Sequence, residues 1–205
     1  MAAGHAGKAK GAPLLALLTG PSGAGKDSLL AHLRSLRRPH YHFAVTATTR
    51  PPRSGEKDGL DYHFVPPERF EEMVRGGELL EHAVVYEHRY GVPRGPIREA
   101  LAQGKDVLLR TDVQGARYIK SVVPGTLTVF VSPPSAEEQE RRLRSRAADS
   151  AEQMALRLRT AREETAGAGE FDYRVVNDDV ARCAGEIEEI MSRERSRPGR
   201  AAVVV

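Results

Sequence analysis

Three short apolar runs recur along the chain, and, apart from Thr128 in the third, each is continuous rather than alternating with polar positions. They are residues 14–18, 107–109 and 127–131. An unbroken run of this length is typical of a strand buried on both faces, as the strands of a parallel sheet are. Segments with helical periodicity follow them, at about 27–37, 114–121 and 136–165. This alternation predicts an α/β fold, a three-layer α/β/α sandwich around a parallel core sheet.

Two segments interrupt the alternation. Residues 46–94 are rich in proline and glycine, with short extended pieces and a helix at about 67–75, and a short strand at 43–46 leads into them. Residues 135–168 are helical and dense in charge. Inserted segments of this kind are expected to be lobes that close over substrates. The predicted organisation is therefore a flexible leader at 1–12, a core in three pieces at 13–45, 95–134 and 169–193, two lobes at 46–94 and 135–168, and a basic tail at 194–205.

The first apolar run ends in a glycine-rich loop with the spacing G-x-x-x-x-G-K. Its residues are Gly20, Pro21, Ser22, Gly23, Ala24, Gly25 and Lys26. Glycines let successive backbone N–H groups point at one anion, with the positive end of the following helix behind them. The loop therefore predicts a cradle for the phosphates of ATP, with Lys26 reaching the outer phosphates. The alternative is a plain strand-to-helix turn with a solvated lysine, which the strand before and the helix after disfavour.

The position after the lysine departs from this motif. A serine or threonine that holds Mg²⁺ is usual there, whereas this chain has Asp27 followed by Ser28. A carboxylate can also be a Mg²⁺ ligand, so Asp27 is a candidate metal ligand. It also places a negative charge beside the phosphates, which requires compensation.

Composition limits the class of protein and its partners. A chain of 205 residues suffices for one core with small inserted lobes. The net charge of +3 favours an anionic partner, but much of the excess lies near the two ends rather than on one face shaped for nucleic acid. A single cysteine, Cys183, excludes an internal disulfide framework, and no apolar run is long enough to span a membrane. We predict a cytoplasmic protein, monomeric or homodimeric, that binds neither nucleic acid nor membrane.

Further motifs point to one family. Residues 48–64 read TTRPPRSGEKDGLDYHF, and GELLE, YGVP, DVQG and DYRVVNDD follow at 77–81, 90–93, 112–115 and 172–179. The first segment closely resembles the nucleoside monophosphate signature of guanylate kinases, and the others follow in that family's order. The similarity covers about residues 13–192. It implies a P-loop kinase with a GMP-binding lobe and a helical lid, which uses Mg²⁺ and ATP to phosphorylate GMP and dGMP.

Two arginines in this signature are suited to an acceptor phosphate. Arg50 and Arg53 lie three apart on a proline-stiffened segment, so both guanidinium groups can face one anion. Tyr62 and Tyr90 can offer hydroxyl groups to the same anion. The resemblance implies that these four residues hold the GMP phosphate. The alternative from local sequence is a solvated arginine pair and two core tyrosines.

The resemblance also assigns residues to the bases and the moving phosphoryl group. Glu81 would accept hydrogen bonds from N1–H and the exocyclic amine of guanine, a donor pair that adenine lacks. Thr46 would serve guanine O6, and Asp112 would be a further acid on the GMP side. Arg142, Arg146 and Arg157, with Lys26, match catalytic cations that grip ATP phosphates and the transition state. Asn177 matches a position near the adenine, and Ser28 completes the ATP-binding set.

A second departure offers a partner for Asp27. Two positions before Asp112 the family usually has an acid, and this chain has Arg110. We hypothesise a charge exchange, in which Asp27 and Arg110 pair or both lie in the Mg²⁺ shell.

Three other functions are alternatives to guanylate kinase activity. Ribose 1,5-bisphosphate phosphokinases also carry an aspartate after the P-loop lysine, but a sugar phosphate does not require the base-reading residues. A non-catalytic guanylate-kinase-like binding module would have little use for Lys26 and the helical arginines. A nucleic-acid-binding protein would need aromatic platforms or a reading motif, which the sequence lacks.

Overall fold

The computed structural model describes residues 11–85, 87–144 and 151–205. Its core is a five-stranded sheet in which every neighbouring pair is parallel. In spatial order the strands are β2 (Tyr41–Phe43), β7 (Asp106–Arg110), β1 (Leu15–Thr19), β8 (Leu127–Ser132) and β9 (Tyr173–Val176). The first apolar run thus forms the central strand, with Leu15 opposite Val107 and Ala16 opposite Leu127.

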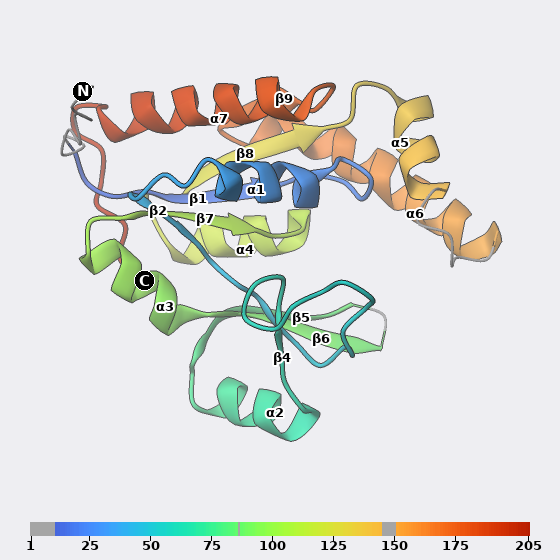
Figure 1. Ribbon diagram of the computed structural model, residues 1–205, viewed down its shortest axis with the longest axis horizontal. Helices are drawn as coiled ribbons and strands as arrows, with labels where there is room; N and C mark the ends of the chain where they lie inside the picture. Colours follow the sequence, from blue (N-terminus) through green and yellow to red (C-terminus); the bar gives the residue numbers. More distant parts are fainter. Residues whose placement is uncertain (1–10, 86, 145–150) are drawn as a thin grey trace, which may run out of the picture.

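Helices cover both faces of this sheet (Figure 1). One face packs against α1 (Lys26–Ser35) and α7 (Val180–Arg195), and the other against α3 (Arg94–Ala102) and α4 (Val113–Val122). Along β1, Ala16 and Leu18 face the first pair of helices, whereas Leu15 and Leu17 face the second. All four are fully buried, which is why the run has no polar position. The predicted three-layer α/β/α sandwich with a parallel core sheet is confirmed.

Residues 47–93 form a second unit, called the small lobe below. Its four-stranded sheet has the order β4 (His63–Phe64), β3 (Ala47–Thr48), β6 (His88–Pro93) and β5 (Leu79–Val85). The helix α2 (Pro67–Arg75) packs on it through Phe70 and Met73. The small lobe lies below the layered core in Figure 1, and Leu80 and Val92 of its sheet pack into the core cluster that includes α3 and α4.

The strand predicted at 43–46 is placed wrongly. Strand β2 ends at Phe43 and β3 begins at Ala47, so the predicted strand falls on the link between the two sheets. The amide of Ala44 still donates to the carbonyl of Leu108 in the core sheet, at 2.9 Å, and the amide of His63 donates to the carbonyl of Thr46 in the small lobe, also at 2.9 Å. The apolar pattern therefore continues across a change of sheet.

The charge-dense segment contains two helices, α5 (Ala136–Arg144) and α6 (Ala151–Ala166), and a 3₁₀ turn at Gly167–Glu170 precedes β9. The helix predicted over 136–165 therefore matches two described helices, while residues 145–150 lie outside the described part of the chain. Arg146 falls in that range.

The chain after α7 has no helix or strand, yet it is fastened to the core. Helix α7 ends at Arg195, which forms an ion pair with the buried Asp106. Arg200 pairs with Glu194, and Val203 and Val205 pack against the core cluster that includes α3 and α4. Val203 and Val205 therefore belong to the core packing, whereas Val204 between them is exposed. Of the described helices, none is both long and apolar enough to cross a membrane.

Candidate functional site

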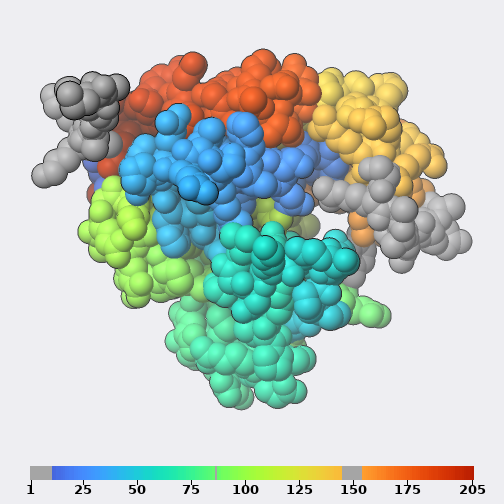
Figure 2. Space-filling model, in the orientation of Figure 1, coloured from blue at the N-terminus to red at the C-terminus, as the bar shows by residue number. Residues whose placement is uncertain are grey.

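A cavity of about 550 Å³ opens where the carboxyl ends of β1 and β7, the small lobe and α6 meet. Ligands of open α/β sheets bind at this edge, outside the carboxyl ends of the strands. Figure 2 shows a notch in the outline of the molecule between the small lobe and the side that carries α5 and α6. The cavity is lined by these residues predicted from the sequence: Gly20, Pro21, Ser22, Gly23, Ala24, Gly25, Lys26, Asp27, Thr46, Tyr62, Glu81, Tyr90, Asp112 and Arg157.

The glycine loop has a backbone shape that other residues would not adopt. Gly20 and Gly25 have φ angles of 136° and 82°, in the region that favours glycine. A Cβ atom on Gly20 would lie 2.1 Å from the carbonyl oxygen of Val131, and one on Gly25 would lie 2.4 Å from Nδ2 of Asn177. The loop can therefore lie close against β8 and β9 only with glycine at both positions.

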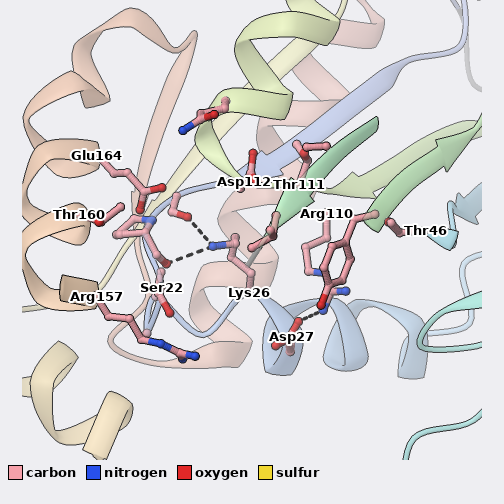
Figure 3. Close-up of a pocket in the computed structure, with 18 of the residues that line it drawn as sticks. Ser22, Lys26, Asp27, Thr46, Arg110, Thr111, Asp112, Arg157, Thr160 and Glu164 are labelled. Atoms are coloured by element: carbon pink, nitrogen blue, oxygen red, sulfur yellow. Dashed lines mark hydrogen bonds and ion pairs between the residues drawn. The ribbon is translucent and has the colours of Figure 1, made fainter. Parts of the chain in front are cut away.

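The first residues of α1 place a cation and an anion beside the loop (Figure 3). The ammonium group of Lys26 donates to the carbonyl oxygens of Gly20 and Pro21, the latter at 3.0 Å. Asp27, the next residue, forms an ion pair with Arg110 at the end of β7. The hypothesis that Asp27 and Arg110 pair is confirmed, so the two departures from the family pattern offset each other's charge.

Residues behind the loop hold its backbone in place. Asn177 is buried and donates to the carbonyl oxygen of Ala24 at 2.8 Å, and Gln139 on α5 donates to that of Ser22 at 2.7 Å. Arg142 donates in turn to the carbonyl of Asn177 at 3.1 Å. Asn177 therefore contacts the loop directly and Arg142 supports it through Asn177, both from outside the cavity, and Ser28 is exposed outside it as well.

Two carboxyl groups face the cavity from opposite units. Glu81 comes from β5 of the small lobe, and Asp112 follows β7 of the core. Asp112 caps α4 by accepting a hydrogen bond from the amide of Gly115 at 2.7 Å. Burial, and then the negative charge of Asp112, raise the pKa of Glu81 to about 7. Thr46 and Tyr90 line the same part of the cavity.

Arg50 and Arg53, the two arginines predicted to bind the acceptor phosphate, differ in burial and in their position relative to the cavity. Arg50 is buried, donates to both carboxylate oxygens of Glu56 at 2.8 and 2.9 Å, and lies 5.3 Å from the centre of the Tyr62 ring. The rings of Tyr62 and Tyr90 meet edge to face with centroids 6.0 Å apart. Arg53 is exposed and does not line the cavity. Arg50, Tyr62 and Tyr90 thus form one cluster, and the part of Arg53 in phosphate binding stays a prediction.

One face of α6 turns toward the glycine loop at 20–26, the predicted phosphate loop, as Figure 3 shows. Arg157, Thr160 and Glu164 all line the cavity, at helical spacings of three and four residues. Burial raises the pKa of Glu164, while the charge of Lys26 acts in the opposite direction. Thr160 and Glu164 were not found from the sequence, although their spacing from Arg157 could have indicated them. Thr111 was also missed, although it stands directly before Asp112 at the end of a buried strand.

The donor groups suit a metal ion that arrives with a nucleotide. Within the described ranges, no group of three or more His, Cys, Asp or Glu side chains could hold a metal ion. Mg²⁺ is usually held by one or two carboxylates together with substrate phosphates and water, and Asp27 places one carboxylate beside the phosphate cradle. The residues present therefore fit Mg²⁺ carried by ATP rather than a cage made by the protein.

Comparisons with known proteins agree with this geometry. The family model described as guanylate kinase matches residues 13–194. A guanylate kinase of Frankia casuarinae is 47% identical over 86% of this chain and 96% of its own length, and one of Gloeobacter violaceus is 46% identical over 92% and 93%. The crystal structure of guanylate kinase from Anaplasma phagocytophilum superposes with a TM-score of 0.76 at 32% identity, covering 93% of this chain and 90% of that one.

Proposed function

The chain belongs to the guanylate kinase family, and we propose that it transfers the γ-phosphoryl group of ATP to GMP, and also to dGMP. One observation carries the proposal most directly. The phosphate cradle around Lys26 and the carboxyl group of Glu81 open into one cavity, from the core and the small lobe respectively. A nucleotide donor and a guanine-bearing acceptor can therefore bind with their phosphates facing each other.

On the donor side, the loop amides and Lys26 hold the ATP phosphates. Mg²⁺ bound to ATP would neutralise phosphate charge, with Asp27 as the protein residue beside it. Arg157 on α6 and Arg142 on α5 add positive charge around the transferred group, and we assign the same task to Arg146. Phosphoryl transfer depends mainly on positioning and on charge stabilisation of this kind. Asn177 and Ser28 support the ATP site from outside the cavity.

On the acceptor side, the small lobe supplies the specificity. Ionised Glu81 accepts the two adjacent donors of guanine, and Thr46 donates to its O6. Arg50, Arg53, Tyr62 and Tyr90 hold the acceptor phosphate, with Arg50 exchanging Glu56 for the ligand. Adenine would leave the buried carboxylate of Glu81 without hydrogen-bond donors, and a mismatch of this kind favours the correct base by roughly 10⁴-fold or more. AMP should therefore be a very poor substrate. No strong base is needed, because the acceptor oxygen of GMP is already anionic.

We further propose that residues 46–94 are the GMP-binding lobe and residues 135–168 a lid that excludes water. The protein is proposed to be cytoplasmic, monomeric or homodimeric, and without nucleic-acid or membrane partners. These proposals rest on the family and on the mild, dispersed positive charge.

The test is a coupled assay of ADP formation with ATP and Mg²⁺, in which GMP, AMP and ribose 1,5-bisphosphate are offered in parallel. Turnover with GMP alone is expected. Glu81→Gln should lose GMP turnover while the affinity for ATP is retained, and Glu68→Gln, an exposed change on α2, should behave as the unchanged protein. Turnover with the sugar bisphosphate instead of GMP would refute the assignment. The absence of ADP formation with all three acceptors would favour a binding module.

A further inference from the structure

Arg110 lies where the core meets the small lobe. It ends strand β7 and lines the cavity, and its side chain is 21% exposed. Its guanidinium group makes an ion pair with Asp27 at the start of α1, as the dashed line in Figure 3 shows. The same group lies over the ring of Tyr62, 4.9 Å from its centre. One side chain therefore contacts the donor end of the core and an acceptor-side ring of the small lobe.

The two contacts suit the shape of an arginine side chain. A guanidinium group is planar, so its face can stack on an aromatic ring while its edge donates hydrogen bonds to a carboxylate. Lysine, a compact ammonium group, cannot make both contacts in the same way. The ion pair with Asp27 thus helps to hold the guanidinium group of Arg110 over the ring of Tyr62.

Tyr62 is held from two sides. Arg50 and Tyr90 contact its ring from within the small lobe, at 5.3 and 6.0 Å between centres. Among the described residues, Arg110 provides the cation contact to this ring that comes from the core. The backbone at Tyr62 is bonded within the small lobe: its carbonyl accepts from the amide of Gly59 at 2.8 Å, and the amide of His63 donates to the carbonyl of Thr46 at 2.9 Å. These bonds fix the segment to the small lobe, whereas the contact with Arg110 joins the ring of Tyr62 to the core.

We propose that Arg110 is a positioning residue for the acceptor phosphate: it holds Tyr62 against the core, and Asp27 holds Arg110 in the orientation that this requires. The inference rests on the proposed function, in which Tyr62 binds the phosphate of GMP. The proposal predicts that a change on the donor side affects the acceptor side. Asp27 belongs to the donor side by position, yet its loss should weaken binding of the acceptor.

The experiment measures GMP binding by calorimetry without ATP, together with KM and kcat for each substrate. Arg110→Met removes the charge and the planar group while retaining similar length. It should weaken GMP binding about 3- to 30-fold, the range for a partly buried cation–π contact, with kcat changed much less. Arg110→Lys should bind GMP with intermediate affinity, and Asp27→Asn should also raise the GMP dissociation constant. Arg38→Met, which breaks an exposed pair with Glu188 far from the cavity, is the matched control.

A double-mutant cycle separates positioning from a general charge effect. If Arg110 acts through Tyr62, Arg110→Met should cost little further GMP affinity in a Tyr62→Leu background. Equal costs in both backgrounds, or unchanged GMP binding in Arg110→Met, would overturn the inference. A loss of kcat with both KM values unchanged would do so too. If Arg110→Met does not fold, Arg110→Lys and Asp27→Asn give the same comparison. Absence of GMP binding by the unchanged protein would instead refute the proposed function.

Discussion

Glu81 links guanine recognition to pH. Burial and the charge of Asp112 raise the pKa of this carboxyl group to about 7, whereas recognition of guanine needs its ionised form. With a pKa of about 7, roughly nine tenths of the group is ionised at pH 8 and roughly one tenth at pH 6. The affinity for GMP should therefore fall about ten-fold between pH 8 and pH 6.

The stability of the nucleotide-free protein should respond in the opposite direction. The folded chain keeps a proton on Glu81 that the unfolded chain releases above its ordinary pKa of 4.5. The contribution of this group to the free energy of unfolding is thus fully present below about pH 4.5 and is lost as the pH rises through about 7. General acid damage to the fold would lower affinity and stability together, so opposite trends identify the carboxyl group.

The assay is GMP titration calorimetry from pH 6 to pH 8, compared with Asp112→Asn. Asparagine also caps helices well, so this variant keeps the bond to the Gly115 amide while removing the charge. The loss of affinity should then move to lower pH. The phosphate of GMP titrates near pH 6 in both proteins, so the comparison cancels it. A flat affinity between pH 6 and 8, or an identical profile in Asp112→Asn, would refute the reasoning.

Three further predictions concern the phosphate loop and the end of the chain. Gly25→Ala places a Cβ at a φ of 82° and 2.4 Å from Nδ2 of Asn177, so it should abolish measurable ATP binding in calorimetry. The strained backbone alone should lower the free energy of unfolding by about 1–2 kcal/mol. ATP binding close to that of the unchanged protein would contradict the cradle geometry. Glu164→Gln removes a negative charge that faces the loop, and its KM for ATP should fall about five-fold, the equivalent of about 1 kcal/mol; a higher KM would mean that the carboxylate assists binding. Arg195→Leu leaves the carboxylate of Asp106 buried without its ion-pair partner and should lower the free energy of unfolding in urea by about 3–5 kcal/mol; a loss below about 1 kcal/mol would show that the pair does not fasten α7 to the core.

The sequence alone located an element whose ends are marked by neighbouring residues. The helix at 67–75 has the predicted ends, because prolines mark its start and glycines follow it. It misplaced the strand at 43–46, since an apolar pattern does not reveal that the chain leaves one sheet for another. It also predicted only a basic tail at 194–205, because the packing of Val203 and Val205 depends on a surface that includes α3 and α4.

What the sequence determined by itself is the glycine-rich loop and the family. The spacing of Gly20, Gly25 and Lys26 imposes a backbone shape that needs no distant partner to be predicted. The pairing of Asp27 with Arg110 could be proposed, because two departures of opposite charge stood out against the family pattern. Only the tertiary structure placed the ring of Tyr62 on that arginine and Glu164 opposite the phosphate loop. Asp27 and Arg110 meet because the parallel strands β1 and β7 end at the same edge of the sheet, whereas Tyr62 and Glu164 reach that edge from the small lobe and from α6.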